Sequence, residues 1–353
     1  MQSFANDSNH QISIQELTWE DISNFSLTMF DNDPNFDRIK DLVMKVVGAS
    51  DGVFLWARLV VRSLLKSIGY HATEKDLKRK LDLLPKGLDE LFDQIPETID
   101  SEDQLMSDQL FLLTIPDFCP WRPAVLNAIA YSWLEDLENP DFPYDLPIQK
   151  YTQTEIGVRL ERVSCFLDRL SRGLLEMSRK RSGGVDGNDY FSYEVGFLHR
   201  SVREYISNTR ELQMRDHGPE FDAYSGIFRL QLTEFKFALS TSDDTDLDTW
   251  VECAGEAGVL RAKLDDLLLM LAWASSIEKY DIPSRFIEEI GHIVDEYSRM
   301  VHTRRQDLPE NDIQAFKGHR IWDTNCQHPF HRAWRRRESK HPPDLYATWY
   351  AVL

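Results

Sequence analysis

The feature that most constrains the fold is a change of hydrophobic period within residues 190–206, YFSYEVGFLHRSVREYI. In the first half apolar residues alternate with small or charged ones, which is the period of a half-buried strand. From Leu198 onward apolar residues recur at helical spacing. A strand therefore passes into a helix at His199. The apolar positions are Phe191, Tyr193, Val195 and Phe197 in the strand, then Leu198, Val202, Tyr205 and Ile206 in the helix.

The residues just upstream predict a partner for this strand. Residues 173–178 read as a strand, and a long loop rich in Gly, Asn and Asp connects it to the returning strand. Residues 154–170 predict a helix before the pair. A helix, a two-stranded wing and a second helix that carries His199 form the backbone of a winged-helix domain. The inward positions expected on the first helix are Val158, Val163, Phe166, Leu167 and Leu170.

The N-terminal part predicts a bundle centred on residues 53–65. This helix is apolar on almost every side, so we expect Trp56 or Leu59 to be buried among neighbouring helices. Its cations Arg58, Arg62 and Lys66 are spaced by four and form one narrow stripe. Arg58 and Arg62 allow two interpretations. They pair with acidic groups of a neighbouring domain, or their aliphatic parts lie on apolar surface while their guanidinium groups stay in water. We favour the second.

The remaining chain is expected to be helical, so the predicted class is mainly α. Helices are expected at 104–115, 123–137, 221–239, 259–276 and 283–300, and an ordered, irregular loop at 139–147. The order is a helical bundle, a winged-helix domain with a small β wing, and a C-terminal α-helical region. The expected divisions are a disordered tail at 1–11, a lid-like bundle at 12–100, the winged helix at 101–208, the helical domain at 209–316 and a tail at 317–353.

Bulk composition narrows the function classes. A hydrophobic content of 42% and an aromatic content of 11% are typical of a packed protein. The formal net charge of −19 argues against general binding to nucleic-acid phosphates or anionic membranes. The 4 cysteines lie far apart without a CxxC pair, which favours reduced thiols and a cytoplasmic location. The start of the chain lacks the apolar region of a signal peptide, and the sequence has no apolar run of the ~20 residues that span a bilayer.

Two pairs of segments resemble a known family. GVFLWARLVVRSLL and DLKRKLDLLPKGLDELF are similar to the helical segment that follows the nucleotide-binding core in fungal NACHT-type signal-transduction ATPases, the NLR-like STAND class. RLSRGLLEM and VGFLHRSVREYI resemble the winged-helix segment that comes next in those proteins. The resemblance covers residues 14–206, with the motifs in the expected order. Beyond residue 208 the similarity is loose.

The chain departs from that family in one large respect. The family carries a P-loop ATPase domain before the GVFLW segment, whereas this sequence contains no Gly-Lys dipeptide and so no GxxxxGK[ST] motif. The resemblance therefore implies the regulatory half of a switch, as a truncated gene product or one part of a split protein. We expect a non-catalytic, cytoplasmic interaction module without a cofactor of its own, whose protein partners include a P-loop NTPase domain in trans.

His199 is the candidate site residue. In the STAND class a histidine at this place, the MHD-like motif, contacts the phosphates of the bound nucleotide, and LHRSVRE here matches that pattern. The resemblance thus implies a nucleotide contact for His199 when a partner supplies the nucleotide-binding domain. The alternative is a histidine that caps the helix and packs against the wing. For the isolated chain we favour this structural role, with the ring mostly buried and bonded to a protein group.

Other site classes have weaker signals. Cys326, His328 and His331 are metal-binding types without a second ligand pair. Asp244, Asp246 and Asp248 imitate a calcium loop, but its sixth and twelfth positions are wrong, so we expect a solvated acidic linker. Two further function classes stay open: a general helical scaffold, and a winged-helix nucleic-acid binder. The second would use the arginines of residues 154–172, but acidic residues lie among them.

Overall fold

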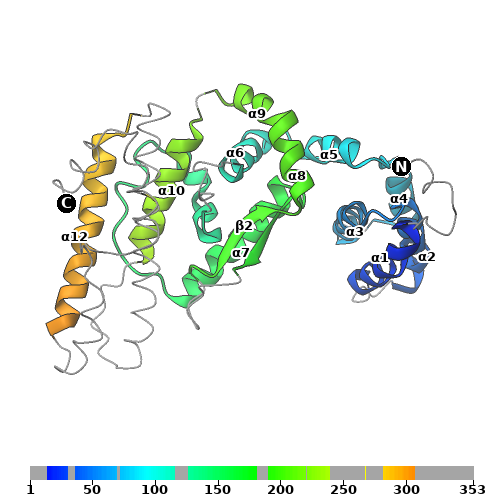
Figure 1. Ribbon diagram of the computed structural model, residues 1–353, viewed down its shortest axis with the longest axis horizontal. Coiled ribbons are helices and arrows are strands. Elements are labelled where there is room, and N and C mark those ends of the chain that lie inside the picture. The colour runs from blue at the N-terminus through cyan, green and yellow to red at the C-terminus, as the bar shows by residue number, and fades with distance from the viewer. Residues whose placement is uncertain are drawn as a thin grey trace, which may run out of the picture.

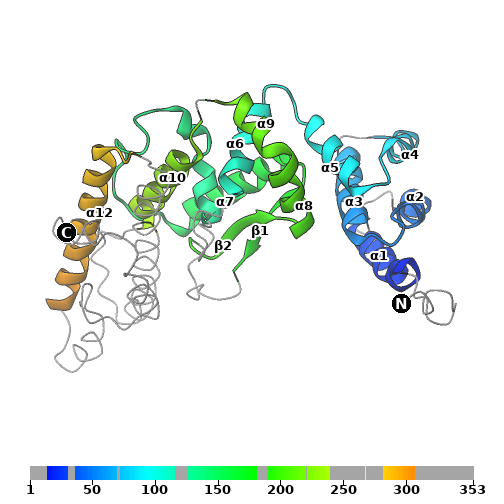
Figure 2. The ribbon, with the colours of Figure 1, turned by 45° about the horizontal axis from the view of Figure 1, so that its top comes forward.

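The computed structural model describes residues 14–30, 36–69, 72–115, 126–180, 190–219, 221–238, 267 and 281–306. Within these residues the chain is mainly helical, and its only sheet is a two-stranded antiparallel hairpin, which confirms the predicted class. Figures 1 and 2 show a helical bundle at one end and, beside it, a unit that contains the hairpin and ends in two longer helices.

The first part is a bundle of short helices. It contains α1 (Ile14–Phe30), α2 (Phe36–Ala49), α3 (Phe54–Gly69), α4 (Glu74–Leu83) and α5 (Leu88–Glu97). Helix α3 lies at its centre, as its apolar pattern predicted: Trp56 is 1% exposed and Leu59 is 3% exposed. The Trp56 indole Nε1 donates to the Pro85 carbonyl at 2.8 Å, so the ring is buried with its polar atom satisfied.

Local sequence signals set several ends of these helices. Thr73 and Asp76 form a capping box at the start of α4, in which each side chain bonds the other residue's backbone N–H. Pro96 lies in the last turn of α5, which ends one residue later. The bundle therefore follows its sequence pattern closely.

The central unit has the element order of a winged helix. It contains α6 (Gln104–Thr114), two 3-10 turns η2 (Ala128–Trp133) and η3 (Glu135–Glu138), α7 (Gln153–Leu170), β1 (Leu175–Arg179) and β2 (Tyr193–Phe197). The strands pair antiparallel, with Leu175 opposite Phe197 and Arg179 opposite Tyr193. A capping box of Thr152 and Glu155 begins α7.

Two expectations for this unit are wrong. An α-helix was predicted over 123–137, but the described part forms η2 and η3. The Asn127 backbone is committed elsewhere, because it bridges to Glu194 and its N–H donates to Glu234 Oε1 at 3.1 Å. All six residues of η2 are buried, so they do not form a single apolar stripe. Val158, expected to face inward, is 62% exposed on α7.

The chain then continues as one helical rod with a wider turn in its middle. Helix α8 (Arg200–Tyr205) passes through the π-helical turn η4 (Ile206–Arg210) into α9 (Glu211–His217), which packs against α6. Two longer helices follow, α10 (Ala223–Ala238) and α12 (Ser284–Gln306), near the predicted ranges 221–239 and 283–300. Figures 1 and 2 show α12 beside α10, on the side away from the bundle.

Several predictions fall outside the described residues. These are the tail at 1–11, the acidic linker at 242–248, most of the helix at 259–276, and the tail at 317–353. The domain limits expected at residues 100, 208 and 316 stay predictions. In the part of the chain that the structure describes, no helix combines the length and apolar character needed to cross a bilayer.

Candidate functional site

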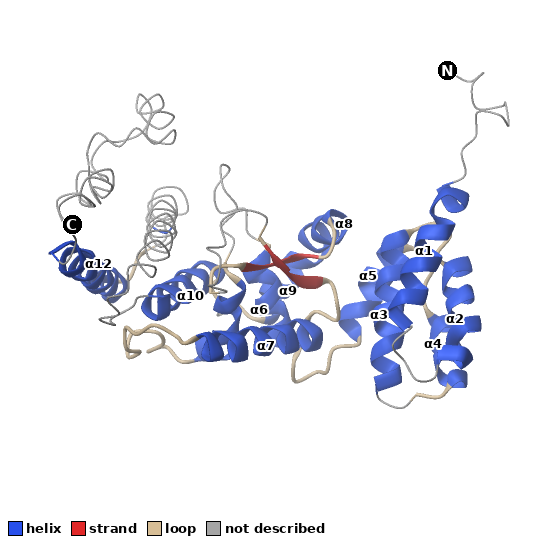
Figure 3. Cartoon of the chain, turned by 90° about the horizontal axis from the view of Figure 1, so that it is seen from below, coloured by secondary structure: helices blue, strands red, loops and turns tan. Residues whose placement is uncertain are grey.

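The most distinctive polar surface lies where the bundle meets the central unit. Figures 1 and 3 show α3 and α5 on the side of the bundle that faces this unit, with α2 and α4 on the far side. The cationic stripe of α3 points across the junction. Arg58 Nη2 contacts Glu176 Oε2 of β1 at 2.6 Å, and Arg62 Nη2 contacts Asp168 Oδ1 of α7 at 3.0 Å.

Lys66 completes the stripe. Its ammonium lies 3.0 Å from the same Asp168 Oδ1 atom and donates to the Asp168 carbonyl at 2.9 Å. Burial lowers the pKa of Lys66, and the bond to Asp168 opposes that shift. Our preferred reading, in which Arg58 and Arg62 end in water, is therefore wrong. Both arginines form ion pairs with the neighbouring unit, because their spacing of four aligns them with the carboxylates of Glu176 and Asp168.

A special backbone conformation brings the two units together. Arg172 and Gly173 have φ values of 50° and 98°, and they turn the chain from α7 into β1. A Cβ built on Gly173 would lie 3.1 Å from Arg62 Cδ, tighter than ordinary contact. Glycine thus serves both the left-handed backbone and the close approach of α3. Arg172 reaches back to the bundle side and donates to the Thr98 carbonyl at 3.1 Å.

A second contact between the units lies at α5 and α8. The rings of Phe92 and Tyr205 are tilted, with centroids 5.3 Å apart. The Tyr205 hydroxyl donates to Asp93 Oδ1, and Arg210 Nη1 reaches the Asp93 carbonyl at 3.4 Å. Burial raises the pKa of Tyr205 to about 12, and the bond to Asp93 acts in the same direction. This contact is apolar at its centre, unlike the ion pairs of α3.

His199 is the N-cap of α8. Its backbone is extended, and the ring Nδ1 accepts the Ser201 N–H at 3.1 Å. The cap predicted by the structural reading is present, but the expected burial is wrong, since the residue is exposed. The cap bond joins His199 to Ser201 only, so it forms without burial of the ring by other helices or strands. Because Nδ1 accepts, the neutral ring carries its proton on Nε2, which leaves an N–H donor on an exposed side chain.

A polar cleft lies next to His199, along α8, η4 and α9. Its volume is about 590 Å³. Its arginines are partly neutralised within their own helices, since Arg200 pairs with Glu204 at 2.7 Å and Arg215 with Glu211 at 2.8 Å. The lining residues are Ile115, Arg200, Arg203, Glu204, Ser207, Asn208, Glu211, Arg215, Ala223 and Tyr224. His199 flanks this cleft without lining it.

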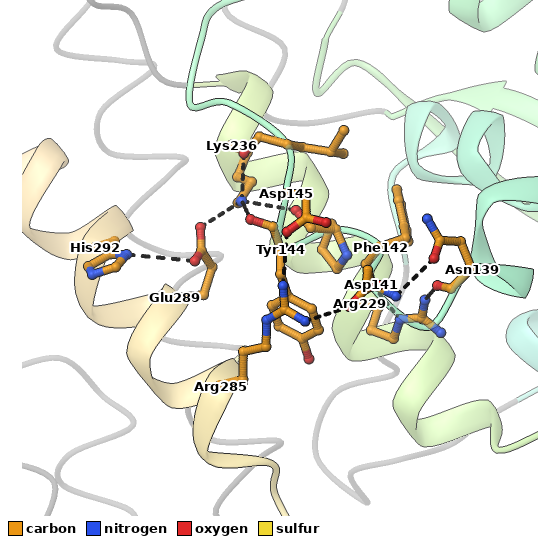
Figure 4. Close-up of polar contacts among 12 residues, drawn as sticks. Asn139, Asp141, Phe142, Tyr144, Asp145, Arg229, Lys236, Arg285, Glu289 and His292 are labelled. Carbon is orange, nitrogen blue, oxygen red and sulfur yellow. Dashed lines mark hydrogen bonds and ion pairs between the residues drawn. The ribbon is translucent and has the colours of Figure 1, made fainter.

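A second polar assembly, which the sequence patterns missed, joins loop 139–147, α10 and α12 (Figure 4). Lys236 is 1% exposed and donates to the carbonyls of Pro143, Tyr144 and Leu146 at 2.9, 3.1 and 2.7 Å. It also pairs with Glu289 Oε1 of α12 at 2.6 Å. The available signal was a lysine inside the apolar run of α10.

Two arginines complete this assembly. From α10, Arg229 donates to the loop carbonyls of Phe142, at 2.8 Å, and Asn139, and to the carbonyl of Leu137 in η3 at 3.0 Å. From α12, Arg285 contacts Asp141 at 2.8 Å and Asp145 at 2.9 Å, and its guanidinium lies 4.4 Å from the Tyr144 ring centroid. Arg229 and Lys236 explain why an irregular loop with three prolines is ordered, as the sequence predicted.

Metal-binding types do not converge in the part of the chain that the structure describes, where no group of three or more His, Cys, Asp or Glu side chains has suitable geometry. The weak metal candidates Cys326, His328 and His331 lie outside the described residues, as do Asp244, Asp246 and Asp248.

Comparisons with known proteins give one match. A family model described as a domain of unknown function, DUF7791, matches residues 116–246. This range runs from before η2 through α7, both strands and α8 to α10. No curated protein and no solved structure matches the chain.

Proposed function

We propose that this chain is a non-catalytic regulatory and protein-interaction module of a fungal NLR-like switch of the NACHT/STAND class. It works with a P-loop NTPase domain supplied by a partner. The observation that carries the proposal is the ion-paired junction at which Arg58, Arg62 and Lys66 meet Glu176 and Asp168.

The junction has the chemistry of a reversible contact. The Asp168 side chain is 50% exposed, and Arg62 and Lys66 are 32% and 28% exposed. Such ion pairs contribute only about 0 to 1 kcal/mol each, so separating them requires little free energy. Polar interfaces between parts of one chain favour relative motion. The contact of Phe92 with Tyr205 provides a pivot that keeps α5 attached while α3 separates.

In the proposed switch, His199 supplies a hydrogen-bond donor for a partner protein. Its Nδ1 is occupied by the helix cap, and the Nε2–H is left to bind an acceptor from outside the chain. A phosphate oxygen held by a P-loop domain in trans is such an acceptor. The cofactor contact of His199 therefore depends on the partner, and the purified chain should show no turnover of ATP or GTP, since it lacks the phosphate-binding motif.

Internal contacts weigh against the nucleic-acid reading. Arg159 lies over the Trp133 ring, 4.8 Å from its centroid, and Arg162 pairs with Glu135 at 2.5 Å. Arg169 reaches the same carboxylate at 3.4 Å. The α7 arginines that would contact phosphates are thus already engaged within the unit, which favours protein partners over DNA or RNA.

Affinity capture tests the proposal. The tagged full chain is incubated with lysate of the source cells, with and without added ADP, and bound proteins are identified by mass spectrometry. We expect a P-loop NTPase whose recovery depends on ADP and falls in His199→Ala. A matched change on the same helix, Arg200→Ala, removes an exposed side chain without removing the cap.

The contrary result is equally clear. Failure to enrich any P-loop protein under either nucleotide condition would reject the partner in trans. Sustained hydrolysis by the purified chain, above a contaminant control, would reject the non-catalytic assignment. Salt-sensitive binding of duplex DNA at micromolar protein concentration would favour the alternative function, a winged-helix nucleic-acid binder.

A further inference from the structure

The bundle side of the α3 junction carries a cation that the ion pairs leave out. Arg62 Nη2 and Lys66 Nζ each lie 3.0 Å from Asp168 Oδ1, so one carboxylate already pairs with two positive charges. Lys80 of α4 lies beside them, because its ammonium donates to Ser67 Oγ at 2.8 Å, and Ser67 follows Lys66 directly on α3. Both acceptors of Lys80 are neutral oxygens, and no carboxylate of the described residues pairs with it.

Arg172 brings a further cation to this place from the central unit. It lies just beyond the end of α7, four residues after Asp168. Its Nη2 donates to the Thr98 carbonyl at 3.1 Å and lies 3.6 Å from Asp100 Oδ2, a carboxylate whose side chain is 78% exposed. The buried Nε of Arg172 has no hydrogen-bond partner in the described part of the chain. The guanidinium is therefore incompletely paired.

The cations of the two units act on one another. Burial lowers the pKa of Lys80, and the positive charges of Arg172 and Lys66 lower it further. Burial is also the main cause that lowers the pKa of Lys66, and Asp168 opposes that shift. Arg62 and Arg172 add to it. Like charges brought together in a partly buried place repel, so the docked junction holds an excess of positive charge that works against docking.

We propose that Lys66, Lys80 and Arg172 form a site for a phosphate-bearing anion, which bridges the bundle and the central unit and holds the junction closed. Two of these cations belong to the bundle and one to the central unit, so the site is complete only when the units are docked. The side chains of Lys66 and Arg172 are 28% and 26% exposed, so a small anion reaches them from solvent. This inference rests on the reversible junction of the proposed function and names a ligand that regulates it.

The chemistry of the three side chains favours phosphate over a simple halide. A phosphate group carries close to two negative charges at neutral pH and several acceptor oxygens, so it can bind donors from several segments at once. Hydrogen bonds from ammonium and guanidinium groups to phosphate are charge-assisted and roughly twice as strong as neutral ones. Because the ligand binds only the docked arrangement, it shifts the equilibrium toward that arrangement. Chloride, in contrast, screens the ion pairs and loosens them.

Calorimetric titration of the full chain at constant ionic strength tests the site. The probes are inorganic pyrophosphate and a short phosphoserine peptide, which present the phosphate group as a free anion and on a protein segment. We expect saturable binding, and the tighter probe identifies the source of the phosphate. Lys80→Gln and Arg172→Gln should each weaken that binding by about tenfold or more, through loss of a charge-assisted bond. Circular dichroism checks the fold of both variants.

The matched control is Arg79→Gln, which makes the same charge change at the neighbouring, exposed position of α4. It should change the affinity by less than about twofold. Equal losses from Arg79→Gln and Lys80→Gln would overturn the proposal, because the anion would then respond only to the general charge of the bundle. Absence of saturable binding for both probes would overturn it as well.

The bridging role has its own readout, the single-molecule distance between fluorophores on α2 and α7. In the salt range where the wild type shows a short and a long distance, the bound probe should enlarge the short-distance population, and it should not do so in Lys80→Gln. Binding without this change would overturn the bridge and leave the proposed function standing. A single distance at every salt concentration would instead contradict the reversible junction, and with it the regulatory role, while the calorimetry still decides whether the anion site exists.

Discussion

Replacing Asp168 by Asn tests the junction at its most heavily used atom. Asp168 Oδ1 contacts both Arg62 and Lys66 at 3.0 Å, so one neutral substitution weakens two ion pairs while keeping the side-chain shape. The bond from Lys66 to the Asp168 carbonyl is a backbone contact and remains. The change therefore isolates the charge of the carboxylate.

The expected loss is small. The three side chains are between 28% and 50% exposed, so solvent screens the pairs and each contributes about 0.2–1 kcal/mol. The two together should lower the free energy of unfolding by about 1 kcal/mol. Exchange of the α3 amides should quicken in the variant, because the contact holds that helix against α7.

The assay is urea unfolding at low and high salt, with hydrogen exchange as the local readout. The difference between wild type and variant should shrink at about 1 M NaCl, where the screening length is about 3 Å. Glu161→Gln is the matched control: it removes an exposed carboxylate from the same helix and should change little. A loss above about 4 kcal/mol, of the size seen for broken buried pairs, or a loss that salt does not alter, would refute the reasoning.

Three further predictions concern single side chains. Trp56→Ala should destabilise the bundle by about 3–5 kcal/mol, since it empties a buried site and orphans the Pro85 carbonyl; Trp56→Phe should cost less by thermal melting. His199→Ala should cost about 0.5–2 kcal/mol through loss of the α8 cap, and His199→Asn should restore most of it. Burial raises the pKa of the Asp108 carboxyl above its ordinary value, and the bond to His217 opposes that rise only in part. The protonated carboxyl therefore favours the folded state more than the charged carboxylate does. Its contribution is therefore complete below its ordinary value of 3.8 and is lost as pH rises through the higher folded value, so Asp108→Asn should flatten that part of the stability profile.

Sequence periodicity predicted the elements whose stability is local. The helix of Trp56, the helix 154–170 and the hairpin before His199 each have a clear apolar period with a cap or turn signal, and the structure has them all. The helix at 123–137 failed because the Asn127 backbone is held by partners far along the chain, Glu194 and Glu234. Hydrogen bonds to residues so far along the chain are not visible in the local hydrophobic pattern.

The candidate sites show the same limit more strongly. The spacing of Arg58, Arg62 and Lys66 was visible in the sequence, but their acidic partners lie more than a hundred residues away. Only the folded structure shows whether those cations point into water or pair with acidic side chains. Lys236 was missed because three of its acceptors are backbone carbonyls, which no residue type reveals, and its carboxylate partner Glu289 lies on a distant helix. His199 was placed correctly as a cap, yet its exposure depends on neighbours that only the fold defines.

The most direct test of the account is a distance across the junction. Donor and acceptor fluorophores at Lys45 on α2 and Glu161 on α7, both exposed, report how far the bundle lies from α7 in single molecules. We predict one short-distance population at low salt, and a longer-distance population that grows with salt and dominates in Asp168→Lys. A single distance that neither salt nor this charge reversal alters would contradict the claim that the bundle docks reversibly through the cations of α3.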